Sequence, residues 1–452
     1  MVGPRTRQRI PGQGKRGESL SREVTTAGTV CLGDTALEPA TNSLAADARC
    51  DVQSSHAGSG KMIALIQEWF AFLLRWLHLM AGIAWVGTSF YFNWFDLSVR
   101  PPKDKVLKEN IRGTLDEIHG GSFYYHEQYW PDKHPERLLV HAWPAKTTLV
   151  TGILLLGLFY WHGARTYLID PSVADIGPLA AIGISIASIT ACWFFYNEVC
   201  YFFSSNRTVF IVMAGFVTAA TYGFQHVFSG RAAYIHAGAM LGTCMGLNVW
   251  TSIVPHHIAM RKQLNSGEPL NRKDGEEAKR RSQHNNYFTL PVTFAMISNH
   301  FAVAYNHHLG WLILCLSMGG GVAIRHYLNI SYKEDRKEQR LLVAIALAFG
   351  AAMGLTFLKK PEPKIIGPVD TPTAMAIIQK RCTTCHSTKP TYSAFVAPPA
   401  GFVMESTEQV LAKSEKIVQR TSVSRDMPLG NVTAMTDDER AMLKVWIEGQ
   451  KK

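Results

Sequence analysis

Residues 381–390 read RCTTCHSTKP, and this stretch decides how the end of the chain folds. Cys382 and Cys385 are separated by two residues, and His386 follows directly. This is the attachment pattern of a c-type haem, because the two thiols form thioethers with one porphyrin and the adjacent imidazole becomes a ligand of the iron. The same cysteines would suit a redox pair or half of a zinc site, but no second CxxC follows in the tail.

Helix signals lie on both sides of this motif. Thr371 followed by Pro372 predicts an N-cap with proline at the first helical position, so that a short helix runs into Arg381. Near the end of the chain, Thr436 and Glu439 have the spacing of a capping box and predict a terminal helix. The flanking helices favour a folded haem domain over an isolated motif.

The second iron ligand is expected to be a methionine. Met427 precedes a proline in the loop RDMPLGN, where the chain can turn under the iron, and a Met/His pair raises the reduction potential of a haem. Met404 and Met435 are the alternatives. Residues 371–452 therefore resemble a class I cytochrome c, with His386 and Met427 as the two iron ligands.

Long apolar runs dominate the rest of the chain. Hydrophobic residues make up 47% of the sequence although the mean hydropathy is +0.00, so apolar blocks alternate with polar ones. The runs long enough, or nearly long enough, to cross a bilayer lie at 65–95, 146–161, 176–203, 208–228, 232–258, 287–305, 309–324 and 341–358. We therefore predict an all-α protein: a polytopic membrane helix bundle of about eight spans at 62–358, a linker at 359–370 and the haem domain at 371–452.

Positive charge indicates which helix ends face the cytoplasm. The loops 96–145, 259–286 and 325–340 carry seven, seven and five Lys or Arg residues, whereas 162–175 and 229–231 carry one each. The positive-inside rule places the first three loops in the cytoplasm of a bacterial inner membrane. Haem attachment takes place outside that membrane, which independently puts the tail in the periplasm. The net charge of +11 follows from this topology and gives no reason to expect nucleic acid binding.

Residues 1–61 do not fit this scheme. They are rich in Arg, Ser and Gly, show no apolar periodicity and lack the apolar core of a secretory signal. Two interpretations are open: a disordered extension, or a spurious segment upstream of a true start at Met62. We favour the start at Met62.

Histidines within the spans are candidates for the chemistry of the bundle, because polar side chains there are costly and usually functional. In the predicted orientation, His226, His236 and His300 lie at one depth near the periplasmic side. Together they can ligate a haem b, bind a metal or act as a catalytic general base. Arg231, in a turn between two spans, can bind an anionic substrate. For any one of these residues alone, a purely structural role explains the position equally well.

A second group of polar side chains lies at the predicted cytoplasmic ends of the spans: His141, His256, His257, His326 and Glu198. Paired histidines also occur in haem–copper oxidases. That family needs more spans and a particular histidine arrangement, neither of which this chain offers, so we reject that interpretation.

Three segments carry a resemblance to a known family: RWLHLMAGIAWVGTSFYFNWFDL (75–97), GRAAYIHAGAMLGTCMGLNVWTSIVPHH (230–257) and NHFAVAYNHHLGW (299–311). With the CxxCH domain that follows, residues 62–452 resemble the bacterial membrane-bound urate hydroxylases, which are urate oxidases with a cytochrome c tail. The resemblance implies oxidation of urate to 5-hydroxyisourate in purine catabolism. Electrons would pass to the haem c and then to respiratory cytochromes or a terminal oxidase, so no hydrogen peroxide would form.

Two other functions remain open from the sequence. The chain would also suit a non-enzymatic, membrane-anchored cytochrome c that relays electrons from a quinol or a partner dehydrogenase. A transporter with a sensing haem is the third reading, although the absence of inverted repeats weighs against it. Reduction of the haem by a purine would distinguish the three.

Overall fold

The structure is a computed structural model that describes residues 43–450 except 102–110, 132–134, 335–337 and 359–362. The described chain is mostly helical. Lys61–Lys452, which holds the bundle from Lys61 onward and the tail, forms one compact unit. Residues 1–42 lie outside the described residues, so the expectation for the N-terminal extension stays a prediction.

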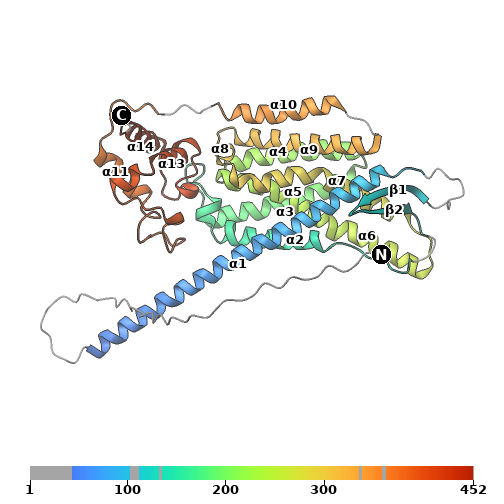
Figure 1. Ribbon diagram of the computed structural model, residues 1–452, viewed down its shortest axis with the longest axis horizontal. Coiled ribbons are helices and arrows are strands. Elements are labelled where there is room, and N and C mark those ends of the chain that lie inside the picture. The colour runs from blue at the N-terminus through green and yellow to red at the C-terminus, as the bar shows by residue number, and fades with distance from the viewer. Residues whose placement is uncertain (1–42, 102–110, 132–134, 335–337, 359–362, 451–452) are drawn as a thin grey trace, which may run out of the picture. The chain divides into compact units, whose positions relative to one another are not determined.

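The helices of the bundle are α1 (Ser43–Ser98), α2 (Trp143–Leu155), α3 (Pro178–Phe202), α4 (Asn206–Gln225), α5 (Gly230–Leu247), α6 (Val254–Ser266), α7 (Arg272–Ile297), α8 (Ala302–Tyr305), α9 (Gly310–Glu334) and α10 (Gln339–Leu355). The tail contains α11 (Thr371–Arg381), α12 (Thr407–Leu411), α13 (Ser414–Val418) and α14 (Asp437–Gly449). A π-helical segment, 248–253, joins α5 to α6. In Figure 1, α3, α5, α7 and α9 run side by side, and each packs against the next.

Small residues set the spacing of the bundle helices. α5 is buried along most of its length, and Ala and Gly occupy many of its buried positions. A Cβ added at Gly238 of α5 would lie 2.7 Å from the Cβ of Ala295 on α7, and one at Gly320 of α9 would lie 2.7 Å from the ring of Phe349 on α10. No side chain fits at either position, so these glycines allow the close helix approach that is typical of membrane bundles.

Within the part of the chain that the structure describes, six segments are long and apolar enough to cross a membrane: Leu65–Ser98, Trp143–Trp161, Pro178–Phe202, Asn206–Gln225, Gly230–Ser266 and Gly310–Glu334. They match six of the eight predicted runs and fit a multi-pass membrane protein. The run 287–305 falls in α7, whose first half is charged, and in the short α8. The run 341–358 falls in α10, which has 17 residues. The count of eight spans is therefore not confirmed.

The all-α prediction is wrong at residues 111–129. This segment forms an antiparallel hairpin of β1 (Ile111–His119) and β2 (Ser122–Tyr129). Gly120 and Gly121 connect the strands with φ values of 58° and 80°. Two successive positive φ values are the requirement of a tight mirror-image hairpin turn, and Gly-Gly between two short runs was the sequence signal for it.

The tail has a hydrophobic core of its own, which includes Ile378 of α11 and Trp446 of α14. The predicted capping box is confirmed, because Thr436 and Glu439 exchange their side-chain-to-backbone hydrogen bonds at the start of α14. The predicted N-cap of α11 is wrong by one residue. Asp370, rather than Thr371, is the N-cap, because its carboxylate oxygen accepts a hydrogen bond from the free backbone amide of Thr373 in the first turn.

Candidate functional site

The bundle has a tail-facing end, formed by the α4–α5 and α8–α9 turns, which contacts the tail. The side-chain amide of Asn306 donates to the carbonyl oxygen of Ser424 at 2.9 Å. The hydroxyls of Thr166 and Tyr392 lie 2.7 Å apart. These two hydrogen bonds connect the bundle directly to the domain that contains the CxxCH motif.

His236, a predicted site residue at this end, is completely buried. Its Nε2 lies 2.6 Å from the hydroxyl of Ser185, and its Nδ1 lies 2.8 Å from the carbonyl oxygen of Ala232. The rings of Tyr160 and Phe228 pack against the imidazole. Because both ring nitrogens have partners, a haem b or a metal ion held by His236 does not fit this arrangement.

The other two predicted histidines have different surroundings. His226 and His300 are both exposed, and His226 packs against Tyr222 with ring centroids 4.4 Å apart and the rings tilted by 44°. Among the described residues, no hydrogen bond or ring contact joins any two of the three predicted imidazoles, and no three His, Cys, Asp or Glu side chains form a metal-binding cluster. The joint site predicted from depth alone stays a prediction.

Arg231 lies where the bundle meets the tail. Its Nη2 donates to the hydroxyl of Tyr305 at 3.4 Å. It lines a pocket of about 30 Å³ together with Asp426 and Asn431 of the tail. That volume is about the share of one water molecule, so the pocket as it stands is too small for a purine.

The opposite end of the bundle, which we call the hairpin end, is formed by the C-termini of α1 and α9, the α3–α4 turn and the start of α7. Gln128 of β2 donates to Asp96 of α1 at 2.7 Å and connects the hairpin to it. A cavity of about 1700 Å³ lies here. Its polar wall includes Asn93, Asn206, Gln283, Asn285, Asn286 and Asn329.

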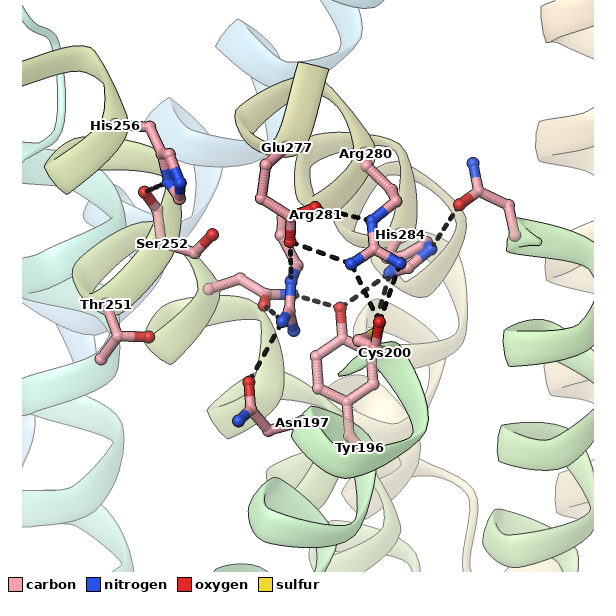
Figure 2. A network of polar contacts seen from close by, with 12 residues as sticks. Tyr196, Asn197, Cys200, Thr251, Ser252, His256, Glu277, Arg280, Arg281 and His284 are labelled. Carbon is pink, nitrogen blue, oxygen red and sulfur yellow. Dashed lines mark hydrogen bonds and ion pairs between the residues drawn. The ribbon is translucent and has the colours of Figure 1, made fainter. Parts of the chain in front are cut away.

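A chain of hydrogen bonds leads from the buried interior to this cavity. The amide of Asn248 donates to the hydroxyl of Tyr196 at 2.8 Å, and that hydroxyl lies 2.8 Å from Nδ1 of His284. Nε2 of His284 lies 3.0 Å from Oδ1 of Asn206, and Nδ2 of the same amide donates to Oε1 of Gln283 at 2.8 Å. Every link is satisfied when His284 carries its proton on Nε2. Figure 2 shows Tyr196 and His284 facing each other in this network.

Charges surround the same chain. Arg281 donates through Nε to Glu277 at 2.9 Å, and Arg280 donates to the same carboxylate at 2.8 Å (Figure 2). Burial raises the pKa of the Glu277 carboxyl, but the two arginine hydrogen bonds lower it by more, so the net shift is downward. Burial lowers the pKa of His284 to about 4, and the arginine charges act in the same direction. His284 is therefore neutral at physiological pH.

Three imidazoles line the cavity, those of His141, His257 and His326, and the ring of His326 is held by a tyrosine. The hydroxyl of Tyr287 lies 2.8 Å from Nδ1 of His326, and both residues line the cavity. This hydrogen bond fixes the ring, as required of a general base whose other nitrogen faces a substrate. The sequence reasoning placed His326 at this end but gave no role to it, and it overlooked Tyr196, Arg281 and His284 because their mutual contacts depend on helix packing.

The CxxCH motif has a geometry that fits a covalent haem. Cys382 is the C-cap of α11, and the backbone amide of His386 donates to its carbonyl oxygen at 2.8 Å, so the motif forms one tight turn. Nδ1 of His386 lies 2.8 Å from the carbonyl oxygen of Phe402. A proton on Nδ1 leaves Nε2 as the nitrogen for iron, which is the usual way in which a ligating histidine is oriented.

The three candidate iron-ligand methionines of the tail, Met404, Met427 and Met435, differ in burial. Met404 and Met435 are buried in the hydrophobic core of the tail, with 5% and 2% of their surface exposed. Met427 is only partly buried, in the loop whose following residues reach the bundle. Binding of a metal by the thioether of Met427 would therefore disrupt fewer core contacts than binding by Met404 or Met435.

Comparison with family models gives one match. The model described as "Urate oxidase N-terminal" matches residues 64–356, which is more than half of the chain and includes both ends of the bundle. The tail lies outside the matched residues. Comparison with curated proteins and with solved structures gave no match. The chain therefore belongs to the urate oxidase N-terminal family.

Proposed function

We propose that the protein is a membrane-bound urate hydroxylase that delivers its electrons to a haem c on its own tail. Membership of the family indicates a urate-related oxidoreductase activity. The observation that carries the proposal is the presence, in one chain, of the family's helix bundle and a CxxCH domain hydrogen-bonded to it. A donor and an acceptor joined in this way need no diffusing partner for the first electron transfer.

The proposed reaction balances with water as the oxygen source. Urate and one water give 5-hydroxyisourate, two electrons and two protons. Because the electrons do not go to oxygen, no hydrogen peroxide forms. The protein must therefore accept two protons near the substrate and conduct two electrons away from it.

The acceptor would be held entirely by the tail. Cys382 and Cys385 would form the thioethers, with His386 and Met427 as the iron ligands. When bound, this group supplies one-electron acceptance, so two transfers in sequence, or a second carrier, must handle each urate. The hydrogen bond between His386 and Phe402 would hold the imidazole in place. From the tail, electrons would pass to respiratory cytochromes or a terminal oxidase in a bacterial inner membrane.

The proton acceptor is a separate question. His226, His236 and His300 are the imidazoles predicted from their depth, and Arg231 is the predicted substrate ligand. His236 is already hydrogen-bonded through both nitrogens. His326 at the hairpin end has one ring nitrogen fixed by Tyr287 and lines a cavity large enough for a purine. We therefore propose His326 as the general base.

The test is an anaerobic spectrum of membranes that contain the full-length protein. The haem is first oxidised, and urate, xanthine or allantoin is then added. The proposal expects the reduced haem c band to appear with urate and not with xanthine or allantoin. A haem that is reduced by quinol or dithionite but never by urate would instead favour the electron relay without enzymatic activity.

A further inference from the structure

Arg325 of α9 is a buried cation whose charge no described partner balances. None of its surface is exposed, and its Nε donates to Oδ1 of Asn286. Its two other guanidinium nitrogens, Nη1 and Nη2, are buried without a hydrogen-bond partner among the described residues. The guanidinium lies 3.7 Å from the ring centroid of Phe90, which fixes its plane. A buried, unpaired charge is costly, and a missing ligand is a common reason for one.

Three asparagine side chains separate this charge from the cavity. Asn93 donates to Oδ1 of Asn329 at 2.8 Å, and Asn286 donates to Oδ1 of Asn93 at 3.1 Å. All three asparagines line the cavity, whereas Arg325 does not. An amide offers both donors and acceptors, so this wall can match the alternating carbonyl and N–H groups of an oxidised purine ring.

The cavity as a whole favours an anion. The cations on its lining are Arg112, Arg207, Arg261, Lys279 and Lys333, and the acidic residues are Asp96 and Glu334. Lys279 and Asp96 pair at 2.8 Å, so the remaining excess is positive. A positively charged, partly enclosed cavity concentrates anions near its walls.

We infer that the wall of Asn93, Asn286 and Asn329, backed by Arg325, binds an oxopurine monoanion. This inference rests on the proposed function, because it identifies where the substrate of that function binds. It places the substrate at the hairpin end, in the cavity of about 1700 Å³, rather than beside Arg231, where the pocket measures about 30 Å³. Arg325 is a positioning residue whose positive charge acts on the substrate from behind the asparagine amides. The asparagines themselves contact the substrate.

The experiment measures equilibrium binding of radiolabelled urate to the full-length protein in nanodiscs. Anaerobic reduction with dithionite keeps the haem reduced, so that no turnover consumes the ligand. We expect Arg325→Gln to raise the Kd about tenfold to a hundredfold, the range for loss of a charged interaction. Arg325→Lys should restore much of the affinity, and Asn329→Leu should raise the Kd about tenfold.

Arg75→Gln is the matched control. Like Arg325 on α9, Arg75 on α1 lies in a candidate membrane span with its guanidinium over an aromatic ring, at 4.0 Å from the ring centroid of Phe159, but it does not line the cavity. Its Kd should stay within about twofold of the wild type. If Arg325→Gln yields no folded protein, judged by a haem that dithionite can reduce, then Asn329→Leu and Asn93→Leu decide the question.

The outcomes separate the two proposals. If the asparagine and arginine variants bind urate as tightly as the wild type while urate still reduces the oxidised haem, the site is wrong and the hydroxylase function stands. If binding depends on these residues but urate never reduces the haem, the site stands and the function is wrong. A wild-type protein that binds no urate overturns both.

Discussion

At the hairpin end the bundle partly encloses a cavity of about 1700 Å³ with amide side chains on its wall, whereas the pocket at the tail-facing end measures about 30 Å³ and is shared with the tail. The separation along α9 from Gly310 to Arg325 is roughly 22 Å, at 1.5 Å per residue. In the proposed scheme, substrate binding and electron acceptance therefore lie at opposite ends of the same helices. Substitutions at one end should change one activity and leave the other intact.

The largest effect is expected from the double substitution Cys382→Ala and Cys385→Ala. Without either thiol no thioether forms, so covalent haem and urate-driven reduction should both be abolished, while urate binding at the hairpin end persists. Haem staining after denaturing electrophoresis, together with the binding assay, measures both. The control is Cys315→Ala, a thiol of α9 outside the motif. Covalent haem in the double variant would refute the assignment.

Loss of the proposed base should have the next largest effect. Removing a general base usually costs at least about a hundredfold in rate, so His326→Gln should slow haem reduction at saturating urate by about that factor. His300→Gln, at the tail-facing end, should change the rate less than about twofold. Stopped-flow absorption of the haem band gives both rates. A large loss of rate in His300→Gln, with little change in His326→Gln, would instead place the general base among the histidines at the tail-facing end.

A pH dependence of stability should arise at the hairpin end. His284 has a pKa of about 4 in the folded protein against 6.5 for a free side chain. Above pH 6.5 it is neutral in both states, and between pH 6.5 and 4 only the unfolded chain binds the proton. The free energy of unfolding should therefore decrease as the pH is lowered from 6.5 to 4, by roughly 3 kcal/mol in total.

Thermal unfolding in detergent from pH 7 to pH 4 measures this loss. His284→Gln should flatten the dependence, because the titrating group is gone. His226→Gln, which replaces an exposed imidazole, should leave the slope as it is in the wild type. An unchanged slope in His284→Gln would show that other groups control the acid sensitivity.

The smallest effect is expected where the bundle meets the tail. Asn306→Leu with Tyr392→Phe removes both described hydrogen bonds between them. At about 1 kcal/mol each, their loss should slow haem reduction several-fold without altering haem attachment or urate affinity. Flash or stopped-flow kinetics would detect it. A change in urate affinity instead would mean that the two ends are not independent.

Local patterns predicted the elements, and packing decided the site. The capping box of Thr436 and Glu439 involves residues three apart, so the sequence alone was enough to find it. Gly120-Gly121 is an equally local signal for the hairpin, but the all-α prediction rests on the long apolar runs on either side of it and does not include that turn.

The candidate site is formed by contacts between different helices, which the spacing of residues along the sequence does not reveal. Arg325 counted only as one more positive charge at a span end, and its burial results from Phe90 on α1 and Asn286 on α7. Conversely, depth in the membrane grouped His236 with two other histidines, but depth does not determine the direction of a side chain. In the structure its imidazole points to Ser185 rather than to a shared site.

The most direct test measures the initial rate of anaerobic haem c reduction against urate concentration in three proteins: the wild type, Arg325→Gln and Arg231→Gln. Binding at the hairpin end predicts that Arg325→Gln raises the half-saturating urate concentration at least about tenfold. Arg231→Gln should alter only the maximal rate. A raised half-saturation in Arg231→Gln, with Arg325→Gln unchanged, would contradict the account and place urate beside the tail.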